Sequence, residues 1–119
     1  MRFRAGMGAG LLALLLLNCS RQVSYSPVFA AVQTGAPSAP GTLKGDYDAA
    51  VRSGSLADAA TRWEHFLKAH KPPGGEYEDA YQQRLIQSAS YELVRVYYLS
   101  GAREKGDQLL KDLDPLQLK

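Results

Sequence analysis

The chain has 119 residues, of which 45% are hydrophobic and 22% charged, and its formal net charge is +2. This length fits one small domain, and the nearly balanced charge does not indicate a nucleic-acid-binding protein. The single cysteine excludes an intramolecular disulfide and a metal site built from several thiolates. Catalytic and phosphate-binding motifs are missing, and the two histidines lack metal-binding spacing, so the sequence predicts neither enzymatic activity nor a cofactor.

The first nineteen residues have the pattern of a secretion signal. Arg2 and Arg4 precede an uncharged stretch, Met7–Leu17, that contains the run LLALLLL. As a helix these eleven residues extend about 16 Å, whereas the hydrocarbon core of a bilayer is about 30 Å thick. We therefore interpret the stretch as the apolar region of a signal peptide, residues 1–18, rather than as a membrane span.

The stretch ends in Leu16-Leu17-Asn18-Cys19, which resembles the lipobox of bacterial lipoproteins. Leu17 and Asn18 depart from it, because small residues are usual at both positions. The resemblance implies diacylglycerol on the Cys19 sulfur, cleavage before this residue, acylation of the new amine and no other cofactor. Ser20 after the cysteine implies an outer-membrane protein that faces the periplasm. The alternative is an ordinary secretion signal with a chance cysteine.

Residues 19–42 have the composition of a tether. They contain Pro27, Pro37 and Pro40 among many small residues, which predicts a flexible linker about 25–30 Å in mean length. A short apolar patch, Val28–Val32, interrupts this composition. It either belongs to the tether or docks on the protein's own domain or on a partner.

In residues 43–119 the apolar residues recur at helical spacing, and apolar and polar residues do not alternate over any long stretch. This pattern predicts an all-α domain. Ser55 and Asp58 form a helix-start signal, and the run Pro72–Gly75 is a strong helix breaker. We expect Pro115 to end the last helix. The four expected helices are Leu43–Arg52, Leu56–His70, Glu76–Leu99 and Ala102–Leu113, and the aromatic residues expected in their core are Trp63, Phe66, Tyr81 and Tyr97.

One spacing occurs twice in this region. Gly54 is followed after five and nine residues by Ala59 and Trp63, and Gly101 is followed at the same spacings by Gly106 and Leu110. With Tyr97 four positions before the second glycine, this resembles the tetratricopeptide (TPR) repeat. The resemblance implies antiparallel helix hairpins joined at Gly54 and Gly101, with a concave binding surface. The alternative is an unrelated four-helix arrangement.

Exposed aromatic residues favour interfaces, and Tyr91 and Tyr98 are the candidates for a partner surface. The sequence therefore predicts a lipid-anchored, non-catalytic adaptor of the bacterial cell envelope. Its expected partners are membrane lipid and another envelope protein, with no nucleic acid, and its role would be in assembly or secretion of envelope proteins. The alternative is a structural or self-associating envelope lipoprotein, such as an entry-exclusion or lysis protein, without a peptide-binding groove.

Overall fold

The computed structural model describes residues 23–117, and this part of the chain contains four helices and no strand. They are α2 (Leu43–Val51), α3 (Leu56–His70), α4 (Ala80–Leu99) and α5 (Arg103–Gln117). The predicted all-α class is confirmed for the described residues. The predicted signal peptide, residues 1–18, and the predicted lipidation site, Cys19, lie outside them.

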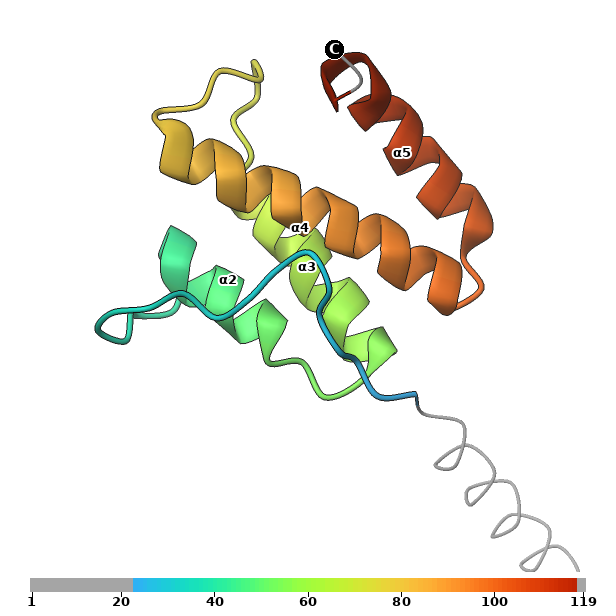
Figure 1. Cartoon of the computed structure of the whole chain (residues 1–119), viewed down its shortest axis with the longest axis horizontal. Coiled ribbons are helices and arrows are strands. Elements are labelled where there is room, and N and C mark those ends of the chain that lie inside the picture. The colour runs from blue at the N-terminus through green and yellow to red at the C-terminus, as the bar shows by residue number, and fades with distance from the viewer. Residues whose placement is uncertain (1–22, 118–119) are drawn as a thin grey trace, which may run out of the picture.

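The helices pack in chain order (Figure 1). α3 lies between α2 and α4, and α5 lies on the other side of α4. An extended segment, residues 23–33, crosses α3 and α4 before the chain reaches α2. We call this segment the strap.

Local side-chain caps fix where α3 and α4 begin. The Asp58 N–H donates to the Ser55 hydroxyl oxygen at 3.1 Å, so the predicted start of α3 is confirmed. At α4 the Gln82 N–H donates to an Asp79 carboxylate oxygen at 2.8 Å. Because Asp79 is a strong N-cap, α4 begins at Ala80, four residues later than we expected.

The last helix is longer than expected. α5 runs to Gln117 and therefore passes through Pro115, so the prediction that this proline ends the helix is wrong. A proline removes one backbone donor and disturbs the carbonyl four residues earlier. Near the end of a helix few further hydrogen bonds depend on that position, and the helix continues.

An aromatic cluster forms the centre of the core. Trp63 and Phe66 are fully buried on α3, as expected, and Tyr47 on α2 is 1% exposed. The ring centroids of Tyr47 and Trp63 are 5.2 Å apart and nearly perpendicular, the edge-to-face geometry that aromatic pairs favour. Tyr81 and Tyr97, also expected in the core, are only partly buried at its border.

The strap is part of this core, which differs from the flexible linker predicted for residues 19–42. The Tyr25 side chain is 7% exposed among the core residues. The Trp63 indole N–H donates to the Tyr25 hydroxyl oxygen at 3.0 Å, and the Leu56 N–H donates to the Val23 carbonyl at 2.9 Å. The strap, which contains Pro27 and several small residues, is held here because a buried aromatic ring and long-range hydrogen bonds offset its conformational entropy.

We expect Gly101→Val to lower the free energy of unfolding by about 1–3 kcal/mol. Gly101 has φ of 87° in the turn between α4 and α5, a conformation that strains a β-branched residue. Gly54→Ala is the matched control, because Gly54 lacks a positive φ and a Cβ there would meet nothing within 4 Å. Urea denaturation of both variants measures the difference. Equal urea midpoints for the two variants would contradict the conclusion that the turn requires glycine at position 101.

Candidate functional site

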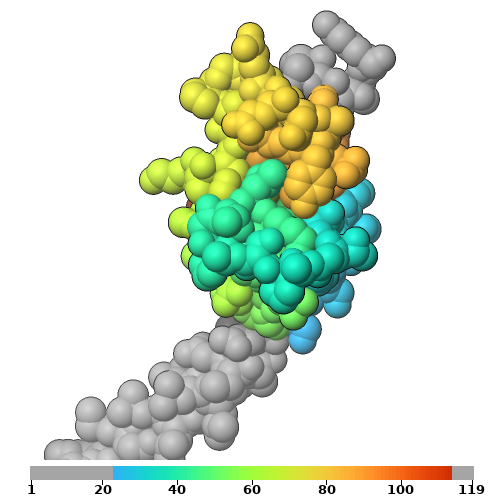
Figure 2. Space-filling view, turned by 90° about the vertical axis from the view of Figure 1, so that its left-hand side faces the viewer, coloured from blue at the N-terminus to red at the C-terminus, as the bar shows by residue number. Residues whose placement is uncertain are grey.

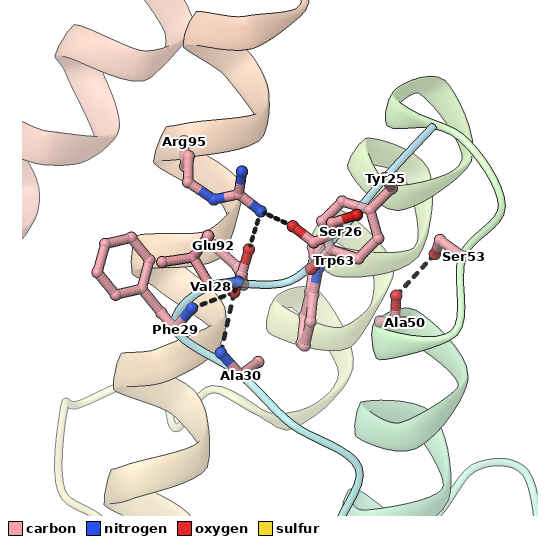
Figure 3. Close-up of polar contacts among 10 residues, drawn as sticks. All are labelled: Tyr25, Ser26, Val28, Phe29, Ala30, Ala50, Ser53, Trp63, Glu92 and Arg95. Atoms are coloured by element: carbon pink, nitrogen blue, oxygen red, sulfur yellow. Dashed lines mark hydrogen bonds and ion pairs between the residues drawn. The ribbon is translucent and has the colours of Figure 1, made fainter. Parts of the chain in front are cut away.

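The most unusual group among the described residues is a fully buried carboxylate, Glu92, on α4. Its Oε2 atom accepts hydrogen bonds from three consecutive backbone N–H groups of the strap, those of Val28, Phe29 and Ala30, at 2.5–2.9 Å (Figure 3). Successive N–H groups that converge on one oxygen are a common backbone arrangement for binding an anion. In this protein the anion is supplied by the protein itself.

Arg95 completes the site from the next turn of α4. One of its terminal nitrogens donates to Glu92 Oε1 at 2.8 Å and to the Ser26 carbonyl oxygen at 2.5 Å. The guanidinium carbon also lies 5.8 Å from the centre of the Tyr25 ring, within cation–π range. The guanidinium therefore joins the strap to α4 through two contacts, with Ser26 and Tyr25, while its ion pair with Glu92 lies within α4. We refer to Glu92, Arg95 and the three strap N–H groups as the Glu92 cluster.

The Glu92 cluster makes the strap and the helices depend on each other. A buried carboxylate is stable only when partners replace the water it has lost. Here four of the five hydrogen bonds at Glu92 and Arg95 involve the strap. Both Glu92 oxygens accept hydrogen bonds, and the side chain is 0% exposed.

The second buried polar contact of the strap is the hydrogen bond between Trp63 and Tyr25. Burial raises the pKa of the Tyr25 phenol well above its ordinary value, although the hydrogen bond from Trp63 acts in the opposite direction. The negative charge of Glu92 adds to the increase. Tyr25 is therefore a neutral phenol at physiological pH, which suits its place in the core.

Carboxylates of α2 hold the end of the strap and the loop that follows it. The Gln33 N–H donates to Asp48 Oδ1 at 2.8 Å, and the Gly41 N–H donates to Asp46 Oδ1 at 2.8 Å. The other Asp46 oxygen lies 2.7 Å from His70 Nε2 at the end of α3. Burial opposes ionisation of Asp46, but the hydrogen bonds with His70 and Gly41 outweigh it and lower the pKa of this carboxyl.

The lowered pKa of Asp46 predicts a defined pH dependence. A carboxyl whose pKa is lower in the folded state stabilises the protein above its unfolded pKa, about 3.9. We therefore expect Asp46→Asn to reduce the free energy of unfolding at pH 5.5. The difference from the original protein should shrink as the pH is lowered toward 2.5, because protonation of Asp46 in the folded state removes this contribution. Denaturation at the two pH values tests this, with the exposed Glu78→Gln as control. A constant difference would contradict it.

The structure places the predicted partner residues in separate contacts. Tyr91 is partly buried, and its ring centre lies 5.8 Å from that of Phe29 on the strap. Tyr98 is 38% exposed, and its hydroxyl donates to Asp107 Oδ1 on α5 at 2.5 Å. Each tyrosine therefore contacts a different neighbour, Tyr91 the strap and Tyr98 α5.

Sequence reasoning did not find the apolar surface that the strap presents. Val28 is 65% exposed, Phe29 51% and Val32 40%, and Phe29 stands beside Tyr91. We call Val28, Phe29 and Val32 the apolar ridge. The Val28–Val32 patch was the available signal, and one of its two interpretations was a segment that docks on the protein's own domain or on a partner. The backbone of this patch is bound to Glu92, while much of its apolar side-chain surface faces outward.

The residues of the predicted repeat occupy unequal environments. Ala59, Trp63 and Gly106 are buried, and a Cβ at Gly106 would lie 2.9 Å from the Tyr98 ring, so α4 and α5 approach closely there. The remaining positions are half-buried or exposed: Gly54, Tyr97, Gly101 and Leu110. The Tyr97 hydroxyl donates to Glu64 on α3.

Residues 23–117 contain no group of three or more side chains placed to hold a metal ion. None of the helices in this part of the chain is both long enough and apolar enough to cross a membrane. Comparison with known proteins finds no matching family model, no similar curated protein and no similar solved structure.

Proposed function

We propose that the protein is a lipid-anchored lipoprotein of the bacterial envelope that acts as a non-catalytic, TPR-like adaptor. In this proposal the mature chain begins at a lipidated Cys19 and faces the periplasm from the outer membrane. Its role is to bind another envelope protein during the assembly or secretion of envelope proteins.

The N-terminal sequence supports the anchor. A basic start, a short apolar stretch and a cysteine directly after it occur together in residues 1–19. Each buried acyl CH₂ contributes about 0.8 kcal/mol of membrane affinity, so more than one chain on Cys19 gives stable attachment. Removal of residues 1–18 takes Arg2 and Arg4 with it, and the mature chain then has 12 basic and 12 acidic residues.

The apolar ridge is the observation that carries the adaptor proposal. Exposed apolar side chains that lie close together on a small domain favour a protein interface. Hydrogen bonds to Glu92 fix the backbone of Val28 and Phe29, so these side chains are presented with little loss of entropy on binding. Tyr91, the partner residue predicted from the sequence, borders the ridge through its contact with Phe29.

Two further observations support the TPR-like and non-catalytic parts of the proposal. The buried small residue Gly106 lets α5 approach Tyr98 of α4 closely, as a small residue does in the second helix of a TPR hairpin. The strongest candidate for an unusual acid, Glu92, is fully occupied by hydrogen bonds that hold the strap.

A second candidate function follows from the same ridge. A second copy of the chain could cover Val28, Phe29 and Val32, as expected for a self-associating envelope lipoprotein. Sedimentation of the Cys19→Ser protein distinguishes the two. A concentration-dependent dimer that Phe29→Ser abolishes would favour self-association over the adaptor.

The direct test combines fractionation and crosslinking in envelopes. We expect the original protein in the membrane fraction and Cys19→Ser in the soluble fraction, because only the lipid holds it. We also expect a specific crosslinked partner that is lost in Phe29→Ser but retained in the control Leu99→Ser, which changes an exposed residue away from the ridge. Membrane retention of Cys19→Ser would contradict the anchor. A crosslinked partner that is still captured by Phe29→Ser would contradict the adaptor surface.

A further inference from the structure

We infer that the strap holds one end of the domain, the end with the turn between α2 and α3, against the surface of the membrane. The inference rests on the proposed lipidation of Cys19 and adds an orientation to it. In this orientation, that end of the domain contacts the headgroup layer of the bilayer that holds the lipid anchor.

The strap is attached to the helices from its first described residue onward. The Val23 carbonyl accepts from the Leu56 N–H at 2.9 Å, at the first turn of α3. Two residues later the Tyr25 ring is buried and bonded to Trp63, and the Ser26 carbonyl accepts from Arg95. The chain is therefore fixed to the domain at Val23 rather than at Leu43, where α2 begins.

The number of residues between the anchor and this fixed point limits the distance between them. Val23 is four residues after Cys19, and four residues span at most about 14 Å even when fully extended. A free linker from Cys19 to Leu43 would reach about 80 Å at full extension. The hydrogen bonds of the strap thus keep Val23 next to the headgroups, where a flexible tether would leave the domain free to turn.

The position of Val23 determines which face meets the membrane. In Figure 1 the strap begins beside the turn between α2 and α3, and the loop of residues 71–79 lies at the opposite end of the molecule. Figure 2, turned by 90°, again has the blue start of the strap and the start of α3 at one end and the yellow 71–79 loop at the other. The Val23 side chain is 58% exposed at the near end, where it can enter the interfacial layer.

Spin labels at two positions can measure this orientation. Ala57 is exposed at the start of α3, and Gly74 is exposed in the 71–79 loop with open space around it. They lie near opposite ends of α3, whose 15 residues extend about 22 Å. In lipidated protein the added thiol of Ala57→Cys or Gly74→Cys is free to take a nitroxide label, because the Cys19 sulfur is blocked.

The experiment places each labelled protein in phosphatidylethanolamine–phosphatidylglycerol vesicles that contain a nickel-chelating lipid. We expect the headgroup nickel to relax the nitroxide at position 57 several-fold more strongly than at position 74. Insertion of twenty Gly-Ser residues between Gln22 and Val23 should make the two positions equal without changing the melting temperature. Equal relaxation without the insertion, or a difference that survives it, would overturn the inference.

Vesicle flotation separates failure of this inference from failure of the anchor. If the original protein does not float with the vesicles, or if Cys19→Ser floats equally well, the proposed lipidation is wrong. If flotation depends on Cys19 and the two labels respond equally, lipidation holds and the membrane-facing orientation is wrong.

Discussion

Replacement of Glu92 by alanine is expected to lower the free energy of unfolding by about 3–5 kcal/mol, the usual cost of removing one partner from a buried ion pair. The change leaves Arg95 and the N–H groups of Val28, Phe29 and Ala30 without their acceptor. Urea denaturation in the Cys19→Ser background, which needs no lipid, measures the loss.

The matched control for Glu92→Ala is Glu76→Ala, which removes an exposed carboxylate from the loop before α4. A surface substitution of this kind usually changes stability by no more than about 0.5 kcal/mol. A Glu92→Ala protein as stable as Glu76→Ala would mean that the strap contributes no net stability through this carboxylate.

The second large effect is expected at Trp63. We predict that Trp63→Ala lowers the free energy of unfolding by about 3–5 kcal/mol. The substitution removes edge-to-face contacts with Tyr47 and Phe66 and leaves the Tyr25 hydroxyl without its donor. The total free energy of unfolding of a small domain is only about 5–15 kcal/mol, so this variant should melt at a much lower temperature.

Thermal melting followed by far-ultraviolet circular dichroism measures this effect, because the variant lacks the only tryptophan. Trp63→Phe is the informative companion, since it keeps an aromatic ring and removes the N–H donor to Tyr25 together with part of the buried indole. We expect its loss of stability to be about 1–2 kcal/mol, near that of one hydrogen bond. Equal losses for alanine and phenylalanine would contradict the packing role of the ring.

The helical part of the fold could be predicted from local sequence signals. Ser55 and Asp58 marked the start of α3 because capping depends on residues three positions apart. The bounds of α4 and α5 were less accurate. The choice of Asp79 as N-cap and the continuation of α5 past Pro115 depend on small energy differences that composition does not reveal.

The strap could not be predicted in the same way, because its contacts join residues more than sixty positions apart. Locally, residues 23–33 resemble a linker, and Glu92 resembles a surface carboxylate beside Arg95. One signal was present in the sequence. Glu92 lies on the apolar stripe of α4 formed by Leu85, Ala89 and Val96, where a solvated carboxylate does not belong.

The strap also changes how the proposed anchor works. A free linker would let the domain search a wide volume above the membrane, whereas an attached strap leaves only the residues between Cys19 and Val23 as the link. It also fixes the backbone that carries the apolar ridge. Attachment of the strap through the Glu92 cluster is therefore the central claim, on which both the orientation and the presentation of the ridge depend.

Hydrogen exchange at the backbone amides of Val28, Phe29 and Ala30 tests this claim most directly. In the Cys19→Ser protein we predict that these amides exchange as slowly as buried amides of α4, because each donates to Glu92. In Glu92→Ala they should exchange much faster while the α4 amides remain protected. Exchange at the rate of an unstructured chain in the Cys19→Ser protein would contradict the attachment of the strap.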